Sequence, residues 1–160
     1  MPQKIYLYIL KGGILASFVS FLLVFDSLLF PYITSKQLVF NILMEVLFIF
    51  WVGLVMKYPQ WRPKRSWVTR GLLAYFVVML ASCFVSPDFN LSFWGDIERM
   101  LGFFHIAHFL VFYLILITVM REWKDWRLVF IVSLAATLFI SIKAIIGSPE
   151  STIGNKAYVA

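Results

Sequence analysis

Long apolar stretches separated by short polar segments dominate the pattern along this chain. An α-helix needs roughly 20 apolar residues to cross the ~30 Å hydrocarbon core of a bilayer. Five stretches meet that length and predict membrane-spanning helices near residues 6–25, 37–56, 67–86, 103–120 and 127–146. We therefore predict an all-α fold, a polytopic transmembrane helical bundle, in which residues 1–160 form one membrane domain with no soluble domain.

Composition and charge exclude the main alternatives to a membrane protein. Hydrophobic residues make up 62% of the chain and charged residues 14%, which leaves too little polar surface to cover a soluble domain. The net charge of +6 does not indicate a nucleic-acid partner, because the Lys and Arg residues punctuate the apolar stretches instead of gathering on one solvated face. Cys83 is the one cysteine, so cysteines form neither a disulfide nor a zinc site within this chain.

The distribution of Lys and Arg between the two ends of the spans predicts the orientation. Positive residues near helix ends favour the cytoplasmic side. Four of them lie on the same side of the membrane as the loop that precedes the span at 103–120: Lys36, Arg99, Lys143 and Lys156. Ten lie on the other side, in the N-terminal tail, "KYPQWRPKRSWVTR" and "REWKDWR": Lys4, Lys11, Lys57, Arg62, Lys64, Arg65, Arg70, Arg121, Lys124 and Arg127. The N-terminus is therefore predicted to be cytoplasmic, with residues 87–102 and 147–160 on the outer face.

Two groups of polar residues fall inside the predicted spans, where ionisable side chains are costly. Glu45 follows Asn41 by one helical turn, which indicates either a proton or substrate site or a hydrogen-bonded clasp between helices. His105 and His108 share one helix face, a spacing that suits a metal ion, but no other residues complete a ligand set. The alternative is a pair of interfacial histidines that satisfy their own hydrogen bonds, and we predict no metal ion and no cofactor.

Three separated segments resemble a known family. "SFWGDIERMLGF" at 92–103 resembles the outer loop of bacterial O-antigen ligase-like membrane proteins, with its Ser-Phe-Trp-x-x-x-x-Arg-x-x-Gly pattern. "LLFPYITSKQLVFNILMEVLF" at 28–48 is similar to that family's first loop and second helix, and "STIGNKAYVA" at 151–160 to its Gly-Thr-x-Gly-Asn-Pro segment. The chain departs from the family pattern at Lys156, where the family often has Pro, and at Ser35, where it has Gly.

The resemblance covers the N-terminal part of the family architecture and implies a function. It implies the N-terminal portion of a glycosyltransferase that transfers or polymerises a glycan from an undecaprenyl-pyrophosphate carrier at the outer face of the bacterial inner membrane. The implied partners are the lipid-linked glycan and membrane lipids. The family's catalytic Arg and His residues lie mostly in a later outer loop, so no catalytic residue is assigned and this portion is expected to be inactive alone.

Carried over by position, the resemblance assigns Arg99 and the Gly154–Asn155 segment to headgroup binding, with Asp96 beside them. The fork of an arginine can grip a phosphate in two places. If residues 95–102 begin the following helix early, Asp96 and Arg99 are three residues apart and can pair, and Arg99 then either binds a headgroup or pins the loop through Asp96 or Glu98. The alternative function, from another class, is a complete five-helix transporter or a membrane assembly subunit without catalysis.

Overall fold

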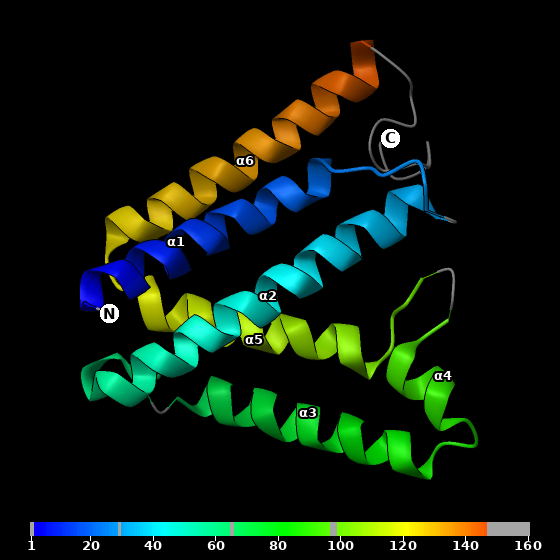
Figure 1. Cartoon of the computed structure of the whole chain (residues 1–160), viewed down its shortest axis with the longest axis horizontal. Coiled ribbons are helices and arrows are strands. Elements are labelled where there is room, and N and C mark those ends of the chain that lie inside the picture. Colours follow the sequence, from blue (N-terminus) through cyan, green and yellow to red (C-terminus); the bar gives the residue numbers. More distant parts are fainter. Residues whose placement is uncertain (1, 29, 65, 97–98, 147–160) are drawn as a thin grey trace.

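Helices make up the regular structure of the chain wherever the structure describes it. The computed structural model describes residues 2–28, 30–64, 66–96 and 99–146 (Figure 1). Within these ranges the elements are α1 (Gln3–Val19), η1 (Ser20–Leu22), α2 (Pro31–Lys57), η2 (Pro59–Trp61), α3 (Trp67–Val85), α4 (Phe89–Trp94), α5 (Phe103–Val119) and α6 (Trp123–Ile146). The predicted all-α fold class is confirmed.

Four helical segments are long and apolar enough to cross a membrane. They are Gln3–Leu22, Pro31–Lys57, Trp67–Val85 and Trp123–Ile146. The apolar helix α5 has 17 residues and is about 26 Å long, slightly less than the ~30 Å hydrocarbon core. These four segments and α5 lie roughly along one direction and alternate in their chain direction, so that their ends lie at the two ends of the bundle (Figure 1). The chain is a multi-pass helical membrane protein.

Local sequence signals explain where several helices begin. Helix α2 begins at Pro31, earlier than the predicted residue 37, because proline is well suited to the first turn, where its missing N–H has no helical partner. Helix α3 begins after Ser66, whose Oγ accepts the N–H groups of Val68 and Thr69. Helix α6 begins at Trp123 instead of near residue 127.

A short helix and a loop precede α5, where an early helix start was considered. Asp88 caps α4 by accepting the N–H of Leu91 at 3.0 Å, and Gly95 ends it with a φ of 85° that favours glycine. The described residues between this glycine and α5 lie in a loop, and α5 begins at Phe103. The early helix start considered for residues 95–102 is therefore not found in the described residues of this segment.

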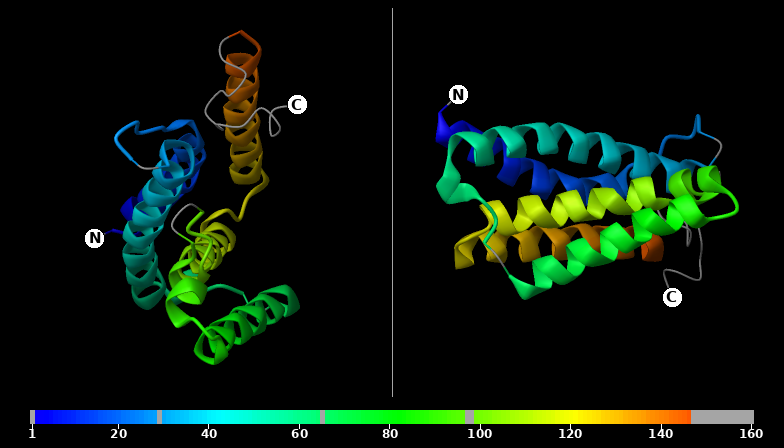
Figure 2. Two further views of the ribbon diagram at one scale, coloured as in Figure 1. Left: turned by 90° about the vertical axis from the view of Figure 1, so that its right-hand side faces the viewer. Right: turned by 90° about the horizontal axis from the view of Figure 1, so that it is seen from below.

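The buried core lies between α1, α2 and α5. Its fully buried side chains include Leu10 and Ile14 of α1, Met44 and Leu54 of α2, and Ile115 of α5. Helices α3 and α6 lie at opposite edges of this group (Figure 2). Both edge helices expose apolar side chains over most of their length. Such faces are compatible with lipid or with further membrane helices around them.

A salt bridge joins the edge helix α6 to α1. Lys11 Nζ lies 2.6 Å from Asp125 Oδ1, and Asp125 is only 11% exposed. Lys11 was counted with the N-terminal tail, but it lies in the middle of α1, where its long side chain reaches the first turn of α6. The pair neutralises a lysine that the apolar environment of the helix would otherwise penalise.

Two adjacent glycines in α1 provide a matched test of the α1–α2 packing. A Cβ at Gly13 would lie 2.6 Å from Leu47 Cδ1, whereas a Cβ at Gly12 would meet nothing within 4 Å. We expect Gly13→Ala to lower the free energy of unfolding by about 1–3 kcal/mol, because Leu47 is buried and has little room to move. We expect Gly12→Ala to be neutral or to stabilise α1 by up to ~1 kcal/mol.

Unfolding of the purified protein in detergent micelles, followed by circular dichroism, measures both changes. Equal stability of the two alanine variants would contradict the close α1–α2 contact.

Candidate functional site

Four polar side chains meet between α2 and α5, inside the membrane-spanning part of the chain. We call them the α2–α5 polar cluster: Asn41, Glu45, His105 and His108. Asn41 and Glu45 are one turn apart on α2, and the two histidines are one turn apart on α5. The helix periodicity therefore presents two polar groups from each helix at the same interface.

His105 is bound to Asn41 in the buried part of this interface. Its Nδ1 lies 2.8 Å from Asn41 Oδ1, and both residues are buried. An amide oxygen accepts, so His105 donates its Nδ1 proton. Phe40 and Phe109 contact the imidazole at ring-centroid distances of 6.1 and 5.2 Å. This contact is a hydrogen-bonded clasp between the helices, one of the two functions considered for Asn41 and Glu45.

His108 contacts a backbone carbonyl through one imidazole nitrogen and Glu45 through the other. Its Nδ1 donates to the Phe104 carbonyl at 2.7 Å, and its Nε2 lies 3.4 Å from Glu45 Oε1. A neutral imidazole has one N–H, which is used at Nδ1, so a hydrogen bond to Glu45 needs one further proton. A proton on Nε2 would make this contact an ion pair, and a proton on the carboxyl group would make it a neutral hydrogen bond. Either form of the pair would have no net charge, which suits a position in the membrane.

Glu45 is the exposed member of the cluster. Its side chain is 56% exposed, whereas that of His108 is 9% exposed. The carboxylate therefore contacts the buried histidine and is also accessible from outside the described helices. An exposed carboxylate at membrane depth usually faces protein or a water-filled cavity.

Further polar contacts extend along α2 and α5 on both sides of the cluster. Trp51 Nε1–H donates to Thr118 Oγ1 at 3.0 Å, nearer to the N-terminal end of the bundle. At the other end, Gln37 Nε2 donates to the Arg99 carbonyl at 2.5 Å. The two helices are thus joined by polar contacts at several depths.

The loop that carries Arg99 is closed by two glycines. The backbones of Gly95 and Gly102 approach so closely that a Cβ on either would collide with the other strand of the loop. Gly102 is buried, whereas Asp96 and Arg99 are exposed. The loop therefore has a rigid base, and the contact from Gln37 fixes the backbone of Arg99 while its side chain stays at the surface.

The residues predicted for headgroup binding are only partly brought together. Asp96 and Arg99 lie in the same loop, but among the described residues no ion pair joins them. Glu98, Gly154 and Asn155 lie outside the described residues. Sequence reasoning missed Gln37, although its place one turn before Asn41 on the same helix face is a signal that α2 continues as a polar stripe.

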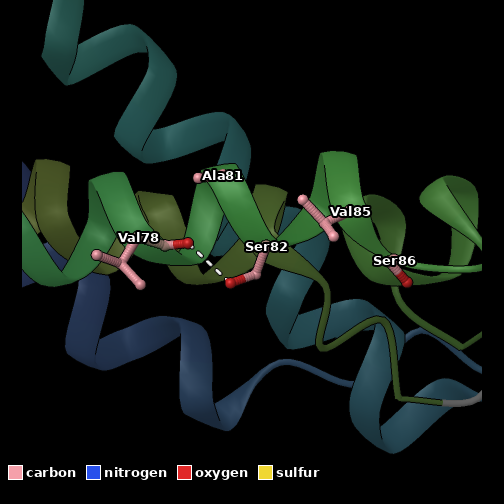
Figure 3. A pocket seen from close by; sticks show the side chains of 5 residues that line it. All are labelled: Val78, Ala81, Ser82, Val85 and Ser86. Carbon is pink, nitrogen blue, oxygen red and sulfur yellow. Dashed lines mark hydrogen bonds between the residues drawn. The ribbon is translucent and has the colours of Figure 1, made fainter.

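Among the described residues, neither the two histidines nor a surface hollow on α3 presents a metal or ligand site. His105 and His108 turn to different partners on α2, and the described ranges contain no group of three His, Cys, Asp or Glu residues that suits a metal ion. A shallow hollow of about 470 Å³ lies over one face of α3 near Ser86 (Figure 3). Ser82, its central polar residue, donates to the Val78 carbonyl at 2.9 Å, so the hollow presents no unsatisfied donor there.

A double-mutant cycle on Asn41 and His105 measures the energy of the clasp. We expect a coupling free energy of about 0.6–1.7 kcal/mol between Asn41→Ala and His105→Ala, as for hydrogen bonds between membrane helices. The control pair is Asn41→Ala with Thr118→Ala, which lies on the same interface without contacting Asn41. Unfolding in micelles provides the four free energies of each cycle, and equal coupling in both cycles would contradict a direct bond.

Comparison of the chain with protein-family models, with curated proteins and with solved structures finds no match. Three features of the chain bear on its function: the contacts of the α2–α5 polar cluster, the Arg99 loop and the sequence motifs that they contain.

Proposed function

We propose that this chain is the N-terminal membrane portion of an O-antigen ligase-like glycosyltransferase. One observation carries the proposal: described residues of the family-like segment 28–48 contact the family-like segment 92–103 and the helix that directly follows it, although more than 60 residues separate the bonded partners. Gln37 contacts Arg99, Asn41 contacts His105 and Glu45 contacts His108. Segments that belong to one functional unit are expected to meet in this way.

Charge supports a location at the outer face of the bacterial inner membrane for the Arg99 loop. Figure 1 shows the start of α1, the α2–α3 connection and the α5–α6 connection at one end of the bundle. The described Lys and Arg residues in or next to these segments are Lys4, Lys57, Arg62, Lys64, Arg70, Arg121, Lys124 and Arg127. Those near the helix ends on the other side are Lys36, Arg99 and Lys143. The positive-inside rule then makes the N-terminus cytoplasmic and the Arg99 loop external.

The proposed reaction explains why an arginine is needed on this loop. Transfer of a glycan from a lipid carrier displaces a pyrophosphate from an anomeric carbon. The leaving group needs cations, and the attacking hydroxyl needs a base. In this proposal Arg99 binds the phosphate groups of the carrier, beside Asp96 and the Gly154–Asn155 segment. The base and further cations come from the later outer loop that the resemblance implies, so the portion in hand binds and positions without completing the reaction.

A transporter is the second candidate, and the His108–Glu45 pair favours it. A carboxylate and an imidazole in contact at membrane depth are typical of proton relays. The two candidates differ in which residue is essential: Arg99 for glycan transfer, and Glu45 for proton-coupled transport.

Labelling of single cysteines tests the orientation. We expect an impermeant thiol reagent, added outside intact cells, to label Asp96→Cys and not Lys64→Cys, both in a Cys83→Ser background. Both positions are exposed, and neither side chain caps a helix, so the replacements leave the fold intact. Labelling of position 64 alone would reverse the orientation and remove the Arg99 loop from the outer face.

Conservative substitution of Arg99 tests the proposed function in the full-length parent protein. We expect Arg99→Lys to lower glycan transfer by at least about tenfold at unchanged protein levels, because lysine keeps the charge and loses the bidentate grip. The control is Arg127→Lys, an exposed arginine at the opposite end of the bundle, which should retain full activity. Full transfer by Arg99→Lys would overturn the headgroup role. If Arg99→Lys retained full glycan transfer and Glu45→Gln lost a proton-coupled flux, the transporter would be favoured.

A further inference from the structure

A pocket of about 290 Å³ is lined by residues of α1, η1, α2 and α6. Its apolar walls are Phe18 and Phe21 from the end of α1 and from η1, and Ala136 from α6. Lys36 of α2 also lines it. A crevice between membrane helices that opens to the hydrocarbon region is accessible to lipid chains.

The polar groups of α6 in this pocket do not prevent a lipid chain from lying there. Ser133 Oγ donates to the Phe130 carbonyl at 2.9 Å, and Thr137 Oγ1 donates to the Ser133 carbonyl at 2.9 Å. Both hydroxyl hydrogens are therefore used within α6. Because Ser133, Ala136 and Thr137 are small, they leave the volume that a larger residue would occupy.

Lys36 lies near the start of α2, the end of this long apolar helix from which a lysine side chain can extend toward lipid headgroups. It is five residues after Pro31, about 8 Å along α2 from the helix start. A lysine near a helix end extends its ammonium toward the headgroups while its methylene stem lies among apolar groups. The ammonium has three N–H donors, so a contact within the protein leaves donors for phosphate oxygens.

We propose that this pocket binds an anionic phospholipid, with the phosphate on Lys36 and an acyl chain between α1 and α6. The argument is charge complementarity: a cation stands beside an apolar pocket, which matches a lipid with a charged head and an apolar tail. This site is separate from the Arg99 loop and does not depend on glycan transfer. The bound lipid fills the space between α6 and the core beyond the Lys11–Asp125 salt bridge.

Native mass spectrometry of the purified chain with palmitoyl-oleoyl phosphatidylglycerol tests the proposal. Palmitoyl-oleoyl phosphatidylcholine, whose headgroup has no net charge, is the comparison lipid. We expect Lys36→Gln to weaken phosphatidylglycerol binding about fivefold, as for the loss of one lysine near a membrane surface, and Lys36→Arg to retain it. Lys143→Gln is the matched control, because Lys143 is an exposed lysine at the same end of the bundle and does not line the pocket.

A second variant tests the part of the pocket that holds the acyl chain. It also tests the proposal if Lys36→Gln fails to fold. Ala136→Leu fills the pocket without changing charge, and we expect it to weaken binding of both lipids while circular dichroism shows an unchanged helix content. Equal phosphatidylglycerol affinity of Lys36→Gln and the unmodified protein would overturn the proposal. Equal losses in Lys36→Gln and Lys143→Gln would also overturn it, in favour of general surface attraction. A protein dimer that excludes lipid and is abolished by Ala136→Leu would make a second copy the occupant instead.

Discussion

Polar side chains inside a membrane have no water to bind, so they need hydrogen-bond partners within the protein. Helices α2 and α5 supply such partners to each other. Asn41 bonds to His105, Glu45 contacts His108, and Trp51 bonds to Thr118. If the two helices separated or slid by a turn, the His105 Nδ1–H and the Trp51 Nε1–H would lose the acceptors shown for them. Apolar packing alone does not set such a register in lipid, because lipid chains are as apolar as the side chains they replace. The polar contacts therefore determine how α2 and α5 are aligned.

The rest of the bundle is arranged around that pair. Helix α1 packs closely against α2 where Gly13 faces Leu47 and Gly53 faces Tyr6, and small residues allow this approach. Helix α6 joins through the Lys11–Asp125 salt bridge, and α3 through the hydrogen bond between Thr69 and Tyr113 at 2.9 Å. The edge helices thus have few polar contacts with the core and broad exposed apolar faces. These faces are where lipid or further helices would be accommodated.

The alignment of α2 and α5 also determines the position of the Arg99 loop, which lies at the end of the bundle opposite the N-terminus. Gln37 continues the polar stripe of α2 and bonds to the backbone of Arg99, so the loop position depends on the same register. The closed base at Gly95 and Gly102 limits how far that loop can move. For the phosphate binding proposed for Arg99, a restricted backbone would mean that less conformational freedom is lost when the ligand binds.

The sequence by itself determined the helices, since backbone hydrogen bonds in a helix are local and about 20 apolar residues are enough to indicate a span. It also indicated which polar residues share a helix face, as with Asn41 and Glu45 or His105 and His108, because that depends only on spacing. Helix α4 was missed because six residues do not form a periodic apolar pattern, and the loop at 95–102 depends on contact between two glycine backbones. Only the tertiary structure decided that Asn41 meets His105 across 64 residues, that Glu45 remains exposed and that Lys36 lines a pocket with α6. These features depend on the rotation and depth at which helices pack, and hydropathy along the chain contains neither quantity.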